Sequence, residues 1–243
     1  MNNLGLAAKD QGDFARAERY FQDSLALRRE TGNRRGIAQS LINLANAAYW
    51  QGDYARTAEF AAQAFDISRE LGDKSNAGFA LESLGMALFK QHHASRPRAM
   101  EALKESLALF TELGDKKGAA LVLTGMGTVA HAQGNFEQAV QLHRQSLKLC
   151  METGEKRRAA FCLEGLAMVA CTQSDYARAI KLFAAASSVR QTVRAPLPDA
   201  ERAAYEPFLV TLHAHVPLAD FQELWAEGQT MSLDAAAAMA QAS

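Results

Sequence analysis

The sequence has little charge of one sign and no long apolar run. Its net charge is −1 over 243 residues, so it lacks the field of one sign that nucleic-acid and membrane-surface binders need. The most apolar window, GAALVLTGMGTVAHA, is shorter than the roughly 20 residues of a membrane-spanning helix. We therefore expect neither a direct nucleic-acid partner nor a membrane partner.

Cysteines are few, and their pattern excludes a disulfide framework. The three thiols, Cys150, Cys162 and Cys171, are odd in number and fall inside apolar helical patterns. This is typical of reduced core residues in a cytoplasm, rather than of a redox or metal site. The N-terminus MNNLGLAAKD also lacks the basic and apolar regions of a secretion signal. We expect a cytoplasmic protein.

Common catalytic and metal-binding motifs are absent. The sequence contains no GxxxxGK[ST], GxSxG, HExxH or CxxC. His92 and His93 lie in a predicted loop, while His213 and His215, two residues apart on a predicted helix, point to different sides. We predict that the chain is not an enzyme and holds no metal ion and no cofactor.

The sequence does contain an internal repeat of about 40 residues. LGLAAKDQGDFARAERYF, from Leu4 to Phe21, returns as LANAAYWQGDYARTAEF, from Leu44 to Phe60. Two markers recur in this register, a glutamine at Gln11, Gln51, Gln91, Gln133 and Gln173 and a glycine at Gly32, Gly72, Gly114 and Gly154. One spacing is two residues longer, within KQHHASRPRAM, which predicts a local loop insertion.

Each repeat is predicted to form a hairpin of two helices. Apolar residues of the first helix follow helical spacing, and a glycine followed by an Asp or Asn N-cap separates the two helices. In the irregular unit Ser95 is the expected cap and Pro97 lies in the first turn. We expect Leu44, Leu84, Met126 and Leu166 to be buried. Small residues allow close helix contacts, at Gly5, Ala45, Gly85, Gly127 and Ala167 in first helices and Ala17, Ala99, Ala139 and Ala179 in second helices, with Thr57 as the exception.

These residues carry a family resemblance. Leu-Gly or Leu-Ala, a Gly-Asp turn, and an alanine followed four residues later by an apolar or aromatic residue (Ala17 to Phe21) resemble the tetratricopeptide repeat. The longer unit resembles the extended type of kinesin light chains and bacterial regulators. The resemblance implies an all-α, right-handed superhelical solenoid of about five stacked antiparallel hairpins over residues 1–190. HEAT-type helix pairs of similar length remain the alternative.

The sequence departs from the family at two points. The aromatic residue expected in the first helix is replaced at Ala8, Ala48, Leu88, Ala130 and Ala170. The terminal proline of the repeat is missing.

Residues 191–243 leave the repeat register and predict a capping segment of short helices. Three helical stretches are expected, separated by Pro217 and Gly228, with Leu218, Phe221 and Trp225 on one apolar face. Such a face would cover the open end of a solenoid, and a separate partner-binding helix is the alternative. The stretches APLPDAERAAYE and FQELWAEGQTMSLDAAAAMA resemble the C-terminus of large bacterial signal-transducing NTPase or LuxR-type transcriptional regulators.

The family resemblance implies that first helices line a concave groove that binds a protein or peptide segment. Asparagine amides can donate to and accept from a peptide backbone, while Met and Phe offer adaptable apolar pockets. Ordinary hydrogen bonding, between helices or to solvent, is the other interpretation of Asn43 and Asn46. By register the partner-binding residues are Asn43, Asn46, Tyr49, Glu82, Met86, Phe89, Thr128, His131, Glu164 and Met168.

A second surface is a basic edge at the turns between repeats. Its cations are Arg34, Arg35, Lys74, Lys116, Lys117 and the run from Lys156 to Arg158. Acidic residues recur shortly before them, at Glu30, Glu70, Glu112 and Glu152, and would neutralise much of the edge. We therefore favour a solvated edge over a phosphate-binding one.

Together these features predict a non-catalytic protein- or peptide-recognition domain. The resemblance of the tail implies the sensor or scaffold part of a bacterial transcriptional regulator. The alternative is a free-standing peptide receptor or adaptor. A nucleotide-binding loop upstream of Met1 would favour the regulator.

The first prediction concerns the N-terminal end. Because Leu4 aligns with Leu44, a complete first helix would begin about three residues before Met1, which leaves Leu4, Leu6 and Phe14 poorly covered. We predict self-association of the chain through this end. Sedimentation at rising concentration should show a shift to a larger species, and a monomer at high concentration would contradict the prediction.

Overall fold

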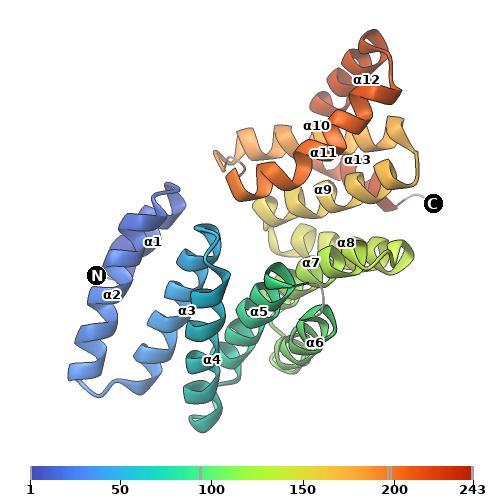
Figure 1. The fold of residues 1–243 in the computed structure, drawn as a ribbon. Helices are drawn as coiled ribbons and strands as arrows, with labels where there is room; N and C mark the ends of the chain where they lie inside the picture. The colour runs from blue at the N-terminus through green and yellow to red at the C-terminus, as the bar shows by residue number, and fades with distance from the viewer. Residues whose placement is uncertain (1, 93–94, 196, 198, 242–243) are drawn as a thin grey trace. The chain divides into compact units, whose positions relative to one another are not determined.

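The computed structural model describes residues 2–92, 95–195, 197 and 199–241. Apart from a 3₁₀ turn at Ser95, the helices within these ranges are α-helices, and no strand is assigned there (Figure 1). The predicted all-α fold of helix hairpins is therefore confirmed. Among the described helices, none combines the length and the hydropathy that a membrane-spanning segment requires. Of the residues discussed above, Met1 and His93 lie outside the described ranges.

The chain forms two compact units, Met1–Gly118 and Ala119–Ser243. The first, unit 1, contains α1 (Asn2–Asp10), α2 (Phe14–Glu30), α3 (Arg34–Trp50), α4 (Tyr54–Glu70), α5 (Lys74–Gln91) and α6 (Arg96–Glu112). The second, unit 2, contains most of α7 (Lys116–Ala132), then α8 (Phe136–Thr153), α9 (Lys156–Thr172), α10 (Tyr176–Thr192), α11 (Asp199–His215), α12 (Leu218–Thr230) and α13 (Leu233–Gln241). The sequence predicts a different boundary, at residue 190, between the repeat array and the capping segment. This boundary is not the one between the two compact units, and it stays a prediction.

The turns between helices are built largely as predicted. The Asp53 carboxylate accepts a hydrogen bond from the Arg56 amide at 3.1 Å, and equivalent caps occur at Asp13, Asn33, Asp73, Asp115 and Asp175. Ser95 occupies the N-cap position of α6 as predicted, but its side chain makes no capping hydrogen bond, and Pro97 lies in the first turn of α6. Asn135 occupies its N-cap position without a side-chain bond.

Helices of one hairpin meet at small residues. The alanines predicted there, Ala17, Ala99, Ala139 and Ala179, are fully buried, as is Thr57. A Cβ added to Gly85 would lie only 2.8 Å from Leu103 Cγ and 3.0 Å from the Ala99 carbonyl oxygen, so there is no room for a larger residue. Of the four predicted core positions, Leu44, Met126 and Leu166 are buried, whereas Leu84 is half-buried.

The first helix is short and partly uncovered. α1 has 9 residues, against 17 in α3. Leu4 is 52% exposed, while Leu6 and Phe14 are half-buried. Phe14 stacks on Trp50, with ring centroids 6.2 Å apart. The uncovered apolar surface is thus concentrated at Leu4, and self-association remains a prediction.

In the tail, α12 packs along α10. Lys181 pairs with Glu227 at 2.5 Å, and a Cβ added to the buried Gly228 would lie 2.7 Å from Ala184 Cβ. Gly228 is thus a contact residue inside α12, so the prediction that it separates two helices is wrong. The break instead follows Thr230, because Met231 takes an extended conformation.

α13 packs against α8, α9 and α10. The last carbonyls of α13 accept hydrogen bonds from Arg144, at 2.8 Å to Ala240, and from Arg178, at 3.1 Å to Met239. Guanidinium groups at this end also complement the helix dipole. In α12, Phe221 is buried and Trp225 half-buried, but Leu218 is 64% exposed and does not belong to the covered face.

The close contact at Gly85 generates a stability prediction. Gly85→Leu should lower the free energy of unfolding, because overpacking costs about 1–3 kcal/mol or more, whereas the gain in helix propensity is only about 1 kcal/mol. Urea unfolding followed by circular dichroism measures the difference. Lys104→Leu, which adds the same side chain at an exposed position of α6, should change stability by less than about 0.5 kcal/mol. An unchanged midpoint for Gly85→Leu would refute the close approach.

Candidate functional site

The two predicted asparagines connect successive first helices. Asn43 is 7% exposed, and its amide donates to Asn2 Oδ1 at 2.8 Å. Asn46 is half-buried, and its Oδ1 accepts a hydrogen bond from Ser83 Oγ at 3.4 Å. These contacts agree with the interhelical interpretation of both side chains. Asn46 as a residue is only partly buried.

The other predicted residues of unit 1 form a half-buried surface on neighbouring helices α3 and α5. Tyr49 packs edge to face against Trp50, at 5.2 Å between centroids, and the Arg96 guanidinium lies 5.7 Å from the Phe89 centroid. Asn46 and Tyr49 occupy the same repeat positions as Met86 and Phe89, 40 residues later. We call this set the α3–α5 face, consisting of Asn46, Tyr49, Glu82, Met86 and Phe89.

The equivalent surface of unit 2 is partly covered by α11. The Phe208 ring lies 5.8 Å from the ring of His131, and Tyr205 donates to Glu164 Oε2 at 3.0 Å. Thr128 and Met168 are half-buried, whereas Glu164 is buried. Glu164 thus binds residues of its own chain.

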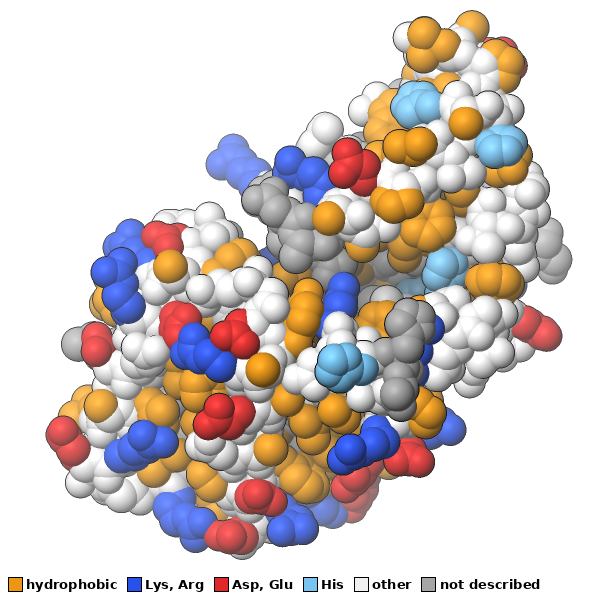
Figure 2. Space-filling model, viewed as in Figure 1, with side chains coloured by type: hydrophobic (Ala, Val, Ile, Leu, Met, Phe, Trp, Pro, Cys, Tyr) orange, Lys and Arg blue, Asp and Glu red, His pale blue; other side chains and the backbone are white. Residues whose placement is uncertain are grey.

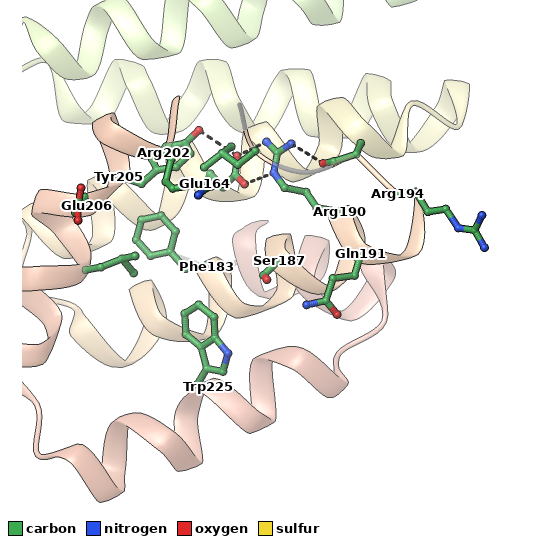
Figure 3. Close-up of a pocket in the computed structure, with 13 residues that line it drawn as sticks. Glu164, Phe183, Ser187, Arg190, Gln191, Arg194, Arg202, Tyr205, Glu206 and Trp225 are labelled. Carbon is green, nitrogen blue, oxygen red and sulfur yellow. Dashed lines mark hydrogen bonds and ion pairs between the residues drawn. The ribbon is translucent and has the colours of Figure 1, made fainter. Parts of the chain in front are cut away.

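A buried ion pair joins α9, α10 and α11 (Figure 3). Arg190 donates from Nε to Glu164 Oε1 at 2.5 Å and from a terminal nitrogen to Oε2 at 2.7 Å. Both side chains are 6% exposed, and the guanidinium lies 4.2 Å from the Phe161 centroid. The sequence analysis missed Arg190 and Tyr205 as partners of Glu164 because no motif links them. Burial without a partner would be costly for either charge, so each requires the other.

The basic edge is paired in unit 1. Arg34 pairs with Glu70, Lys74 pairs with Glu112, and Arg35 binds Asp73 at 2.7 Å. Each of the first two pairs joins the start of a first helix to the end of the second helix of the same hairpin, α3–α4 and α5–α6. Figure 2 shows acidic and basic side chains intermixed over unit 1 on the face in view. These pairs support the solvated-edge interpretation.

In unit 2, His131 is half-buried and the three cysteines are buried among packed helices. Burial lowers the pKa of His131 below its usual 6.5, and His143 lowers it further, against a hydrogen bond with the Met168 backbone that raises it. His131 Nε2 lies 3.2 Å from Thr172 Oγ1. All three cysteines are free and buried, as predicted, and burial raises the pKa of Cys171. Among the described residues, no group of three His, Cys, Asp or Glu side chains could hold a metal ion.

The architecture defines an all-α repeat protein built from helix hairpins. The tetratricopeptide repeat model matches residues 1–69, 97–152 and 118–192, which is more than half of the chain. The chain belongs to the tetratricopeptide repeat family. Proteins of this family are generally non-catalytic scaffolds that bind protein or peptide partners.

Solved structures share the fold. BtubC (BKLC) from P. vanneervenii is 21% identical with a TM-score of 0.60, over 81% of this chain and 80% of that chain. A putative kinesin light chain with nearly identical repeats from Podosopora anserina is 15% identical with a TM-score of 0.56, over 80% and 95%. At these identities the likeness shows the fold alone. No curated protein matches the sequence.

The lowered pKa of His131 predicts a pH dependence of stability. Because the unfolded chain binds this proton more readily than the folded chain, stability should fall as pH drops from about 7 through 6.5 toward the lower folded pKa. His131→Gln should lose less stability than wild type between about pH 7 and pH 5 in urea titrations. His92→Gln, at an exposed position, is the control and should follow wild type. Parallel profiles for His131→Gln and wild type would contradict the assignment.

Proposed function

We propose that the chain is a recognition scaffold that binds an extended segment of a partner protein on the α3–α5 face. The observation that carries the proposal is the row of half-buried side chains at equivalent positions of two repeats. The amide of Asn46, the aromatic rings of Tyr49 and Phe89 and the thioether of Met86 lie on α3 and α5, beside buried positions of the same helices. An extended peptide offers backbone groups to the amide and side chains to the apolar residues.

A comparison of the two units reduces the number of residues that we propose to contact the partner. Glu164 and His131 contact α11, and Asn43 is nearly fully buried. Thr128 and Met168 remain half-buried and stay secondary candidates. We therefore place the main contacts on Asn46, Tyr49, Met86 and Phe89.

The cellular context is a further part of the proposal. The resemblance of the tail to bacterial signal-transducing NTPase and LuxR-type regulators supports a sensor or scaffold role in a transcriptional regulator. The three free, buried thiols fit a reducing cytoplasm. The alternative is a free-standing adaptor, which would bind its partner on the same α3–α5 face. The proposed contacts are therefore the same for a regulator domain and for an adaptor.

The test begins with site-specific cross-linking. p-Benzoylphenylalanine placed at position 86 should cross-link a partner from the native cytosol, whereas the same group at position 59, exposed on α4, should not. The captured segment is then synthesised as a peptide and titrated by calorimetry. Equal cross-linking from both positions would contradict binding on this face.

The titration tests the role of Asn46. Asn46→Ala should weaken peptide binding by about 1–3 kcal/mol, because a peptide backbone group loses its hydrogen-bond partner. Folding should change little, since Ser83 Oγ also donates to the Phe79 carbonyl at 3.1 Å. Glu59→Ala is the matched surface control. If the melting temperature falls together with the affinity, the role of Asn46 is structural. If the affinity is unchanged, the partner binds another surface.

A further inference from the structure

The last repeat ends differently from the others. In the pairs α2–α3, α4–α5 and α8–α9, a second helix packs along the first helix of the following repeat. After α10 this arrangement stops, because α11 makes only a small contact with α10 and α12 packs along it instead. Space is therefore left between α10, α11 and α12.

This space is a cavity of about 580 Å³. Its walls are mainly apolar, with Phe183 from α10 and Trp225 from α12 (Figure 3) and Leu209 from α11. Small-molecule sites occupy roughly 300–1,000 Å³ and combine such walls with a few fixed polar groups.

Fixed polar groups lie on one side of the cavity. Glu164 is neutralised by two bonds from Arg190 and accepts a third from Tyr205. Arg190 also donates to the Ala195 carbonyl at 3.4 Å. This network connects three wall helices. Because the buried carboxylate is neutralised, the cavity does not repel an anion from this side.

At the rim of the cavity, Arg194 occupies the position at which the other repeats have glycine. Arg194 follows Gly154 by 40 residues and has φ of 51°, close to the 71° of Gly154. A residue with a Cβ is disfavoured in this left-handed region, so the exchange has a conformational cost. Arg194, Arg202 and Glu206 are exposed lining residues. In Figure 3 the Arg194 side chain points away from Phe183 and Trp225.

We propose that this cavity is a binding site for a small organic anion with an aromatic or branched apolar body. The body packs between Phe183, Leu209 and Trp225, and the Arg194 side chain turns toward the cavity mouth to bind the anionic group. This site is independent of the α3–α5 face, so either proposal can fail without the other.

Two dyes that differ in one sulfonate test the proposal. 8-Anilinonaphthalene-1-sulfonate is the anionic probe, and N-phenyl-1-naphthylamine is its uncharged counterpart. The chain has two tryptophans, Trp50 and Trp225, so a Trp50→Phe background leaves Trp225 as the only tryptophan reporter. Both probes should change Trp225 emission with saturation at one site, and the anionic probe should bind more tightly.

Arg194→Gly is the decisive variant because it restores the glycine of the other repeats and should not lower the melting temperature. It should weaken binding of the anionic probe about five- to tenfold, while the uncharged probe changes less than about twofold. Arg19→Ala, at an exposed arginine of α2, should leave both affinities unchanged. Ser187→Leu, which fills part of the cavity, should weaken both probes. Unchanged Trp225 emission, or equal anionic-probe affinity in Arg194→Gly and wild type, would overturn the proposal.

Discussion

The close approach of paired helices at glycine and alanine is the constraint on which the rest of this fold depends. At Gly85 there is no space for a side chain beside Leu103 and the Ala99 carbonyl. Two helices can approach this closely and bury their apolar faces only if a small residue stands at the same position of every repeat. The 40-residue spacing is therefore a packing requirement, while side chains on the outer surfaces remain free to carry function.

The features predictable from sequence are those set within one repeat. Helix spacing, the Asp caps and the buried alanines depend on nearby residues, and the structure has them as predicted. Ser95 lies beside the loop insertion, where local rules do not determine the cap geometry. Gly228 reads as a helix break in isolation, yet it is required inside α12 because α10 lies against it. Its role depends on a distant segment, which the local pattern does not contain.

The candidate site shows the same limit. Repeat register places Tyr49 and Phe89 on equivalent, half-buried positions, because this depends only on helix phase. Glu164 has the same phase as Glu82 but a different environment, since Arg190 and Tyr205 close around it. Only the arrangement of α11 against α9 reveals this difference. Register therefore predicts which side chains share a face, but not which of those faces stays open.

The end of the array relaxes the packing constraint. Inside the array, every second helix must fit the next hairpin, so an unfilled space there would interrupt the stack. After α10 no further hairpin has to be seated in register, and α11 and α12 together cover the surface that one first helix covers elsewhere. Because α11 and α12 fit α10 less closely than a first helix does, space is left beside Phe183. The turn after α10 has Arg194 at the position where the other repeats have glycine. A cavity at this position is thus compatible with the repeat, whereas the same cavity between inner hairpins would misalign every repeat that follows.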